Sequence, residues 1–293
     1  MNFRGFRKLW YNSTILLLFK VVLLKRKGEF ILKIGLIGCG SIGEFLLEQL
    51  NKNKQFLDYE ISAVFDARKK STNKLEKLSQ IYKFEVFEDL KAFLNSNIDI
   101  VVECANIQVV KKYATQIIQQ KDLVLISVGA LAEQSLYEEL QSVSKLSGMK
   151  VYLPAGAIGG LELIKAANIM KGLHAVSLIS RKPLAALSDD SLVEETVLFE
   201  GSAKDAIENF PANANVAITL SLAGLGIEKT QVKIIADPAV MKNNHTIQVQ
   251  GDFGEATFTI ENNPSPTNSK TSHLTALSIL STLQSLDKQI TIG

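Results

Sequence analysis

The residues that most clearly suggest chemistry form a glycine loop, Gly38-Cys39-Gly40-Ser41-Ile42-Gly43. In a GxGxxG loop the first glycine permits a tight turn, the second lets the main chain approach a pyrophosphate, and the third lets the next helix pack closely. The free N–H groups and partial positive charge at the start of that helix attract phosphates. The loop therefore predicts dinucleotide contacts at Gly38, Gly40, Ser41, Ile42 and Gly43.

An acidic residue follows at the place where such domains bind ribose. Asp66 ends the next apolar stretch, 59–65, and a carboxylate there accepts hydrogen bonds from the 2′-hydroxyl of the cofactor. The bases at 68–70 come directly afterwards and could hold a 2′-phosphate, although a solvated charge run explains them equally well. We therefore expect NAD or NADP as the cofactor, with NAD favoured.

The chain has three histidines, and His245 is the candidate for acid–base work; His174 and His273 have no support for that role. A neutral imidazole can accept a proton near pH 7. From the residues alone, His245 follows two asparagines and is more readily explained as a turn residue than as a base. Histidine and cysteine show no CxxC or HExxH spacing, so no metal site is predicted.

Two segments of the chain, with different patterns of predicted strands and helices, would position these groups. Residues 31–150 alternate strands (31–37, 59–65, 84–87, 99–102, 123–127) with helices (44–50, 71–82, 108–119, 133–146), which is typical of a Rossmann-type parallel sheet domain. Ala130 follows the last of these strands, where open α/β sheets bind ligands. Residues 151–270 predict an α+β domain with a mixed or antiparallel sheet, made of strands 151–153, 174–180, 196–200, 232–236, 246–251 and 255–261 and helices 157–170 and 213–223. A last helix is predicted over 272–286.

Composition narrows the partners and the compartment. The 293 residues carry a formal net charge of +2, which gives no reason to expect a nucleic acid partner. Two cysteines cannot build a disulfide framework and fit a reduced, cytoplasmic chain. The basic and apolar extension 1–30 is too short and too charged for a stable membrane span. A loosely docked extension, an early start codon and a membrane-surface helix stay open as interpretations of it.

Several motifs together resemble the L-aspartate dehydrogenase family. They are the glycine loop with its strand (34–43), Ser127-Val128-Gly129-Ala130-Leu131-Ala132, Pro154-Ala155-Gly156-Ala157-Ile158-Gly159-Gly160, the stretch 210–217, Asn244-His245, and the stretch 261–272. The resemblance covers roughly residues 31–288, and the later motifs are more specific than the glycine loop. Residues 1–30 have no counterpart in the pattern of that family.

This resemblance implies oxidative deamination of L-aspartate to iminoaspartate, then oxaloacetate and ammonia, with NAD(P) as oxidant. The imine could also feed NAD biosynthesis. It further implies a homodimer or homotetramer and a C-terminal segment, 271–293, that returns to the cofactor domain. A related dehydrogenase or reductase acting on another amino acid or imine, and a dinucleotide sensor without catalysis, are the alternatives.

The resemblance also implies roles for single residues. His245 matches the active-site histidine, Asn215 a cofactor contact, and Gly156-Ala157 a main-chain contact near the nicotinamide; Asn213 is an alternative to Asn215. A dicarboxylate substrate needs cationic or N–H partners. The candidates for that role are Lys182, Lys270, Thr271 and Ser272.

Overall fold

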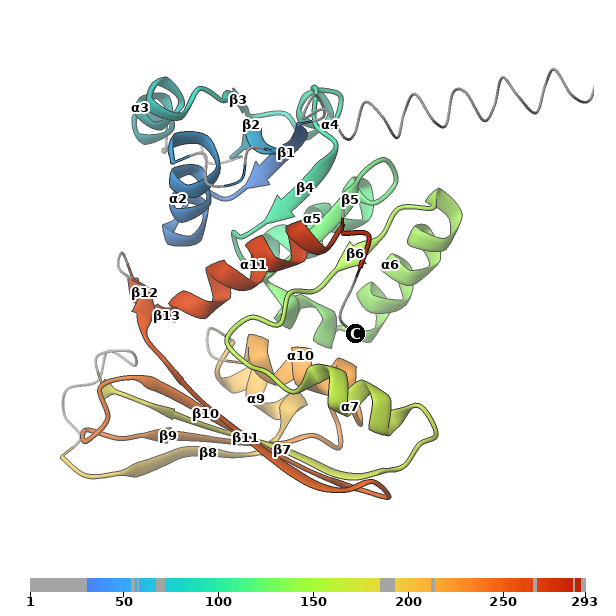
Figure 1. The fold of residues 1–293 in the computed structure, drawn as a ribbon, viewed down its shortest axis with the longest axis vertical. Helices are drawn as coiled ribbons and strands as arrows, with labels where there is room; N and C mark the ends of the chain where they lie inside the picture. The colour runs from blue at the N-terminus through green and yellow to red at the C-terminus, as the bar shows by residue number, and fades with distance from the viewer. Residues whose placement is uncertain are drawn as a thin grey trace, which may run out of the picture.

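The chain folds around two β-sheets with its last helix between them (Figure 1). The computed structural model describes residues 31–53, 56, 58–66, 72–184, 193–211, 214–265, 268–286 and 288–290. The extension 1–30, the basic run 68–70 and Asn213, on which sequence predictions fall, lie outside these residues. No helix in the part of the chain that is described has the length and apolar character needed to cross a membrane.

The first sheet is parallel throughout and has six strands in the order β3-β2-β1-β4-β5-β6. Its strands are β1 (Leu32–Ile37), β2 (Tyr59–Phe65), β3 (Glu85–Phe87), β4 (Ile100–Glu103), β5 (Asp122–Leu125) and β6 (Val151–Tyr152). The central strands are continuous apolar runs because both of their faces are covered. This is the strand order of a dinucleotide-binding domain, so the predicted Rossmann-type sheet is confirmed.

Helices cover both faces of this sheet, and each face has its own core. The first core joins β1 and β2 to α2 (Ser41–Leu47), α3 (Thr72–Tyr82) and the C-terminal helix α11 (His273–Leu286). The second core joins the other face to α4 (Leu90–Leu94), α5 (Ile107–Ile117) and α6 (Gln134–Ser147). A π-helical turn, η1 (Glu48–Lys52), extends α2, and a 3-10 turn, η2 (Val128–Ala132), follows β5.

The second sheet is mixed, with the order β11-β10-β7-β9-β8. Its strands are β7 (Leu173–Lys182), β8 (Thr196–Ser202), β9 (Gln231–Ala236), β10 (Asn243–Gly251) and β11 (Gly254–Asn262); only the β7–β9 pair is parallel. Burial alternates along β7 and β10, so one face packs into the core. That face is covered by α7 (Leu161–Asn168), α9 (Ala203–Asn209) and α10 (Asn215–Ala223).

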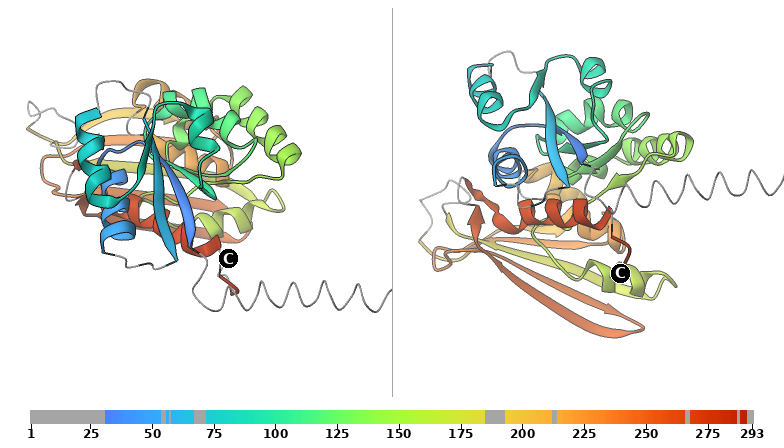
Figure 2. Two further views of the ribbon diagram at one scale, coloured as in Figure 1. Left: turned by 90° about the horizontal axis from the view of Figure 1, so that it is seen from above. Right: turned by 45° about the horizontal axis from the view of Figure 1, so that its top comes forward.

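The C-terminal helix ties the two sheets together, as the two views in Figure 2 show. The Tyr59 hydroxyl on β2 donates to the Leu283 carbonyl of α11 over 3.2 Å. The rings of Phe45 and His273 meet edge to face with centroids 5.2 Å apart. Toward the second domain, the Ser278 hydroxyl accepts the Gly156 N–H at 3.1 Å. Because α11 contacts both domains, it fixes the space between them.

Some predicted boundaries are wrong for identifiable reasons. The parallel sheet continues past residue 150, because β6 pairs with β5. The helix expected over 157–170 begins only at Leu161, since Gly160 has a φ of +79° that no helix interior adopts. The short helices α4 and α9 were not predicted. The segment expected to be a loop before α11 contains a small hairpin, β12 (Pro264–Ser265) and β13 (Asn268–Ser272).

Candidate active site

The glycine loop has the geometry that its sequence requires. Gly38 has a φ of +93°, and a Cβ on it would lie 2.7 Å from the Cα of Ala105. A Cβ on Gly43 would lie 2.5 Å from the Gly38 carbonyl oxygen, so the start of α2 sits directly against the turn. Nothing lies within 4 Å of the place of a Cβ on Gly40. The loop therefore leaves open space over Gly40, where a pyrophosphate could approach the main chain.

A cavity of about 160 Å³ opens beside this loop; we call it the glycine-loop cavity. Gly38 and Gly40 form one wall, and Asp66, which follows β2 directly, lies in the same lining. Asn106 also lines it, but its side-chain oxygen accepts the Val109 N–H at 3.1 Å and so caps α5. The glycine turn, the ribose-side acid and the cavity thus occur together, and the residues present fit a dinucleotide.

The strand ends beside the loop are held by a buried carboxylate that the sequence did not reveal. Glu103 ends β4 and accepts the Ala105 N–H at 2.7 Å, the Ser127 N–H at 3.0 Å and the Ser127 hydroxyl at 2.9 Å. Burial raises the pKa of the Glu103 carboxyl, while the hydrogen bonds from Ser127 and Ala105 oppose this rise. These bonds fix the loops after β4 and β5, which line the space described next.

A second cavity, of about 220 Å³, lies between the two domains; we call it the interdomain cavity. Ile42 of the glycine loop and Cys104 after β4 line it from the first domain. The polar side chains of its described lining come from the second domain and the start of α11. They are Lys182, Asn215, Thr219, Asn243, His245, Thr271, Ser272 and Thr275.

His245 stands on the core-facing side of β10 and is only 3% exposed. Its cross-strand neighbour is Ser180 on β7, and the Ser180 Oγ lies 2.9 Å from the His245 Nδ1. Burial, together with the positive charge of Lys182, lowers the pKa of His245 to about 3. The imidazole is therefore neutral near pH 7, with a lone pair on one of its two ring nitrogens.

His245 lies inside a strand, not before one as its sequence suggested. Asparagine pairs favour turns, and Asn243-Asn244 led to a predicted strand start at residue 246. The structure begins β10 at Asn243, because this segment pairs with β7 on one side and with β11 on the other. The two ladders outweigh the local preference.

Lys182 is the one charged side chain in the described lining of the interdomain cavity. It lies two residues after Ser180 on the same face of β7 and is 6% exposed. Burial lowers the pKa of the Lys182 amine to about 8. A cation thus faces the cavity at neutral pH, beside a neutral imidazole.

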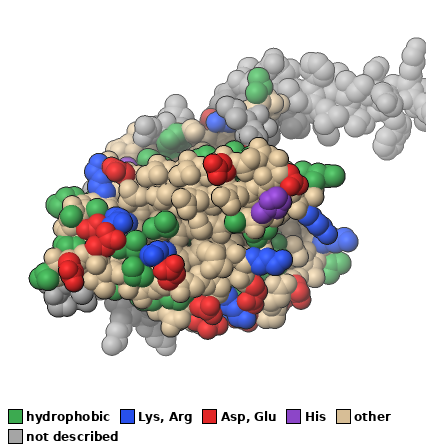
Figure 3. Space-filling view, turned by 90° about the horizontal axis from the view of Figure 1, so that it is seen from below, with side chains coloured by type: hydrophobic (Ala, Val, Ile, Leu, Met, Phe, Trp, Pro, Cys, Tyr) green, Lys and Arg blue, Asp and Glu red, His purple; other side chains and the backbone are tan. Residues whose placement is uncertain are grey.

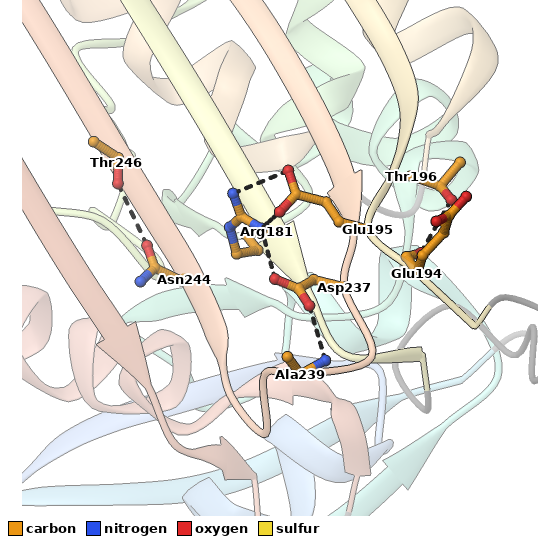
Figure 4. A network of polar contacts seen from close by, with 8 residues as sticks. All are labelled: Arg181, Glu194, Glu195, Thr196, Asp237, Ala239, Asn244 and Thr246. Carbon is orange, nitrogen blue, oxygen red and sulfur yellow. Dashed lines mark hydrogen bonds and ion pairs between the residues drawn. The ribbon is translucent and has the colours of Figure 1, made fainter.

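A network on the opposite face of the sheet holds this strand end in place (Figure 4). The Arg181 guanidinium donates to the Glu195 carboxylate and, over 2.6 Å, to that of Asp237. The Asp237 carboxylate also accepts the Ala239 N–H at 2.8 Å. The Asp237 main-chain N–H in turn donates to the Lys182 carbonyl at 2.9 Å. The network therefore joins the end of β7 to its neighbours and fixes the backbone that carries Lys182.

Asn215 connects the two sides of the interdomain cavity. It begins α10, lines the cavity, and accepts the Gly129 N–H at 2.8 Å with its side-chain oxygen. Ala130, next to Gly129, is fully buried and belongs to the described lining of neither cavity. Val128 of the same 3-10 turn lines the interdomain cavity in its place.

The remaining predicted residues divide into two groups. Gly156 and Ala157 line the interdomain cavity, as do Thr271 and Ser272. Lys270 lies on β13, but its side chain is outside the described part of the structure. Ser41 lines neither cavity; its Oγ lies 3.2 Å from that of Ser265 on β12.

Four polar residues of this region were not predicted: Ser180, Thr219, Asn243 and Thr275. Two of them could have been found by strand periodicity, since Asn243 lies two positions before His245 and Ser180 two before Lys182. Thr219 and Thr275 carry no such signal. Over the residues described, no group of three or more histidines, cysteines or acids is placed to hold a metal ion.

Comparisons with known proteins show the family to which the chain belongs. Residues 162–286 match the family model described as aspartate dehydrogenase, C-terminal, and residues 38–154 match the homoserine dehydrogenase NAD-binding domain. The L-aspartate dehydrogenase of Methanococcoides burtonii is 38% identical over 274 residues, covering 89% of this chain and 99% of that protein. The L-aspartate dehydrogenase of Nitrosopumilus maritimus is 39% identical, covering 86% and 95%.

Solved structures give the same result. The crystal structure of aspartate dehydrogenase from Thermotoga maritima matches with a TM-score of 0.73 and 33% identity, covering 89% of this chain and 99% of that one. Apo scyllo-inositol dehydrogenase from Lactobacillus casei, at a TM-score of 0.55 and 12% identity, shares the fold alone. On the strength of the full-length relatives, the chain belongs to the L-aspartate dehydrogenase family of NAD(P)-binding oxidoreductases.

Proposed function

We propose that the protein catalyses the NAD(P)-dependent oxidative deamination of L-aspartate to iminoaspartate, which water converts to oxaloacetate and ammonia. The observation that carries this proposal is the placement of a neutral imidazole, His245, and a cation, Lys182, in one cavity beside the glycine loop. Relatives that match nearly their whole length are named L-aspartate dehydrogenase.

In the oxidation, the Cα–H bond breaks with its electron pair and a C=N bond forms, while the nitrogen gives up a proton. The bound dinucleotide supplies the hydride acceptor. His245 receives the proton, because its imidazole is neutral near pH 7 and Ser180 holds the ring through Nδ1; the carboxylates of a bound substrate would stabilise the imidazolium that forms. With the Nδ1–H donating to the Ser180 Oγ, Nε2 keeps its lone pair and is the nitrogen that takes the proton. Water then adds to the C=N carbon and ammonia leaves, with His245 again moving the proton.

The substrate's carboxylates would bind to the cationic and hydroxyl groups of the same cavity. Lys182 supplies the charge, and Thr271 and Ser272 supply hydroxyl and main-chain donors at the junction of β13 and α11. Lys270, immediately before them on β13, is proposed as a further partner. A charged group shielded from water strengthens its attraction for an anion, so a dicarboxylate suits this cavity better than a neutral amino acid does.

The proposed contacts with the cofactor divide between the glycine-loop cavity and the interdomain cavity. Gly38, Gly40, Ser41, Ile42 and Gly43 are proposed to hold the pyrophosphate, and Asp66 the adenosine ribose, with either NAD or NADP accepted. The nicotinamide end would reach the interdomain cavity, where Asn215, Gly156 and Ala157 form part of the lining. Ala130 is proposed to support the cofactor site only indirectly, by positioning the neighbouring Val128, because its own side chain is buried and lines neither cavity.

We further propose a homodimer or homotetramer in the cytoplasm. The outer face of the five-stranded sheet carries mainly uncharged polar residues over its centre (Figure 3). Ser177, Thr246, Gln248 and Thr259 are among them. Such a broad, weakly charged face suits a second copy of the chain. A chain with two cysteines suits a reducing compartment, and a role of the imine in NAD biosynthesis is a further part of the proposal.

The experiment that tests this function is a panel of initial rates with L-aspartate, L-alanine and L-glutamate, each with NAD and with NADP. We expect turnover on L-aspartate and little on the other two, because only L-aspartate places two carboxylates correctly around Lys182. Faster turnover on another amino acid would assign the site to a different substrate. Saturable dinucleotide binding without turnover on any amino acid would contradict the proposed catalysis.

A further inference from the structure

An unsatisfied acceptor lies beside His245. Asn243 is two residues before it on β10, on the same face of the strand, and it lines the interdomain cavity. Asn243 is only 4% exposed, and its Oδ1 has no hydrogen-bond partner among the described residues. A buried oxygen without a donor is unfavourable, so native structures rarely keep one without a purpose. Asn243 Oδ1 is therefore a candidate acceptor for a hydrogen-bond donor on a ligand bound in this cavity.

The other groups of the cavity indicate which donor this is. The described lining contains no carboxylate, so a substrate nitrogen meets no acidic partner there. The Asn215 oxygen already accepts the Gly129 N–H. Lys182 is a donor and suits the carboxylates of the substrate. Hydroxyl groups of the lining can also accept, but Asn243 Oδ1 is the buried side-chain oxygen of the described lining that has no hydrogen-bond partner, two strand positions from the base.

We propose that the side-chain oxygen of Asn243 accepts a hydrogen bond from the α-nitrogen of the substrate, both as an amine and as an imine. This inference rests on the proposed function and deepens it by naming the group that recognises nitrogen. Asn243 would hold the nitrogen with one N–H, while His245 takes the proton that leaves. The Cα–H bond is then free to turn toward the hydride acceptor.

The same contact makes the site selective in the reverse direction. A protonated imine carries an N–H that donates to Asn243. The corresponding ketone offers only an acceptor oxygen, which would face the Asn243 oxygen without a proton between them. A site built around a specific hydrogen bond rejects the analogue that cannot make it, because its own buried group is then unpaired. Oxaloacetate itself should therefore be reduced poorly unless ammonia first converts it to the imine.

The test uses two variants, Asn243→Leu and Asn243→Ser. Leucine keeps the volume of the side chain and removes the acceptor; serine is smaller, polar and easily accommodated in a strand. Asn244→Leu and Asn244→Ser are the matched controls, because Asn244 is the next residue and faces the other side of the sheet, where its oxygen is 3.4 Å from the Thr246 hydroxyl. Fluorescence titration with reduced dinucleotide shows which variants retain a folded cofactor domain.

Each protein is given oxaloacetate and reduced dinucleotide, with and without ammonium, and the amino acid and 2-hydroxy acid products are quantified. For wild type and the Asn244 variants we expect product almost only with ammonium. For the Asn243 variants we expect the ratio of amino acid to hydroxy acid to fall about tenfold or more, and the KM for L-aspartate to rise by a similar factor. An unchanged ratio and KM in Asn243 variants that bind dinucleotide normally would overturn the inference.

The outcomes also separate this inference from the function on which it rests. If the wild-type protein fails to form or oxidise L-aspartate, the proposed function fails. If the wild-type protein turns over L-aspartate and the Asn243 variants keep its selectivity, only the role of Asn243 fails. Equal loss in Asn243 and Asn244 variants would point to strand stability as the cause and would also overturn the inference.

Discussion

The Ser180 Oγ lies 2.9 Å from the Nδ1 of His245, and both buried side chains stand on the core-facing side of the adjacent strands β7 and β10. This contact fixes the imidazole ring against β7 and engages one of its two nitrogens. The proposed base is therefore held on a rigid sheet and not on a mobile loop. Its position depends on the pairing of β10 with β7, a contact between residues 65 positions apart.

Replacing Ser180 with alanine should slow catalysis without changing dinucleotide binding. Loss of the hydrogen bond leaves the imidazole free to turn, so we expect kcat to fall about 3- to 30-fold while the KM for L-aspartate stays nearly constant. Ser180→Thr keeps a hydroxyl and should recover part of kcat. Steady-state kinetics on the two variants provides the measurement, and an equal loss in both would show that packing, not the hydroxyl, is responsible.

Lys182→Met should weaken the binding of L-aspartate and stabilise the fold. We expect the KM for L-aspartate to rise at least about tenfold, because a carboxylate loses its cation. Removing an amine whose pKa is lowered by burial should raise the free energy of unfolding by about 1–3 kcal/mol at pH 7. Kinetics and thermal unfolding measure the two effects. Lys233→Met, on the outer face of the same sheet, is the control.

The charge of Lys182 also predicts a pH dependence. Its pKa of about 8 means that the amine loses its proton as the pH rises through 8. The KM for L-aspartate should therefore increase above pH 8 in the wild-type protein, while Lys182→Met should lack this rise. A pH-independent KM between 7 and 9 would remove Lys182 from carboxylate binding.

Asp66→Ala should reduce the affinity for NAD more than that for NADP. The carboxylate accepts hydrogen bonds from a 2′-hydroxyl and repels a 2′-phosphate, so its removal costs one cofactor a bond and relieves the other of a repulsion. Dissociation constants measured by fluorescence titration give the ratio. Equal weakening of both cofactors would show that Asp66 does not contact the ribose.

His245 should make the protein sensitive to acid. Its pKa is about 3 in the folded state and near 6.5 when unfolded, so the unfolded chain binds the extra proton between these values. The free energy of unfolding should therefore decrease as the pH falls below 6.5, by up to about 1.4 kcal/mol per pH unit from this residue. His245→Gln should flatten this slope. Chemical denaturation at pH 7, 6 and 5 measures it.

Sequence patterns predict the first domain better than the second, for a physical reason. The strands of the parallel sheet are apolar on both faces and end in recognisable turns, so β1 and β2 are located almost to the residue. In the second sheet the start of β10 depends on ladders with β7 and β11, which no local signal encodes. The predicted turn at Asn243 and Asn244 fails for that reason.

The candidate site divides in the same way. The glycine loop and Asp66 are recognisable from short sequence motifs. The family resemblance named His245 and Asn215, and the structure places both in the lining of the interdomain cavity. The support around them is not local: Glu103 holds the strand ends of the first domain, and Ser180 meets His245 only after the sheet forms. Such contacts join residues distant in the chain, so they emerge from the fold.

The most direct test compares wild-type protein with His245→Ala, using L-aspartate and NAD or NADP and following the absorbance of the reduced nicotinamide. We expect turnover by the wild type and a kcat about 10²–10⁴-fold lower in the variant, with dinucleotide affinity nearly unchanged. Unchanged turnover in His245→Ala would contradict the assignment of this histidine as the base. No turnover of L-aspartate by the wild type would contradict the proposed reaction itself.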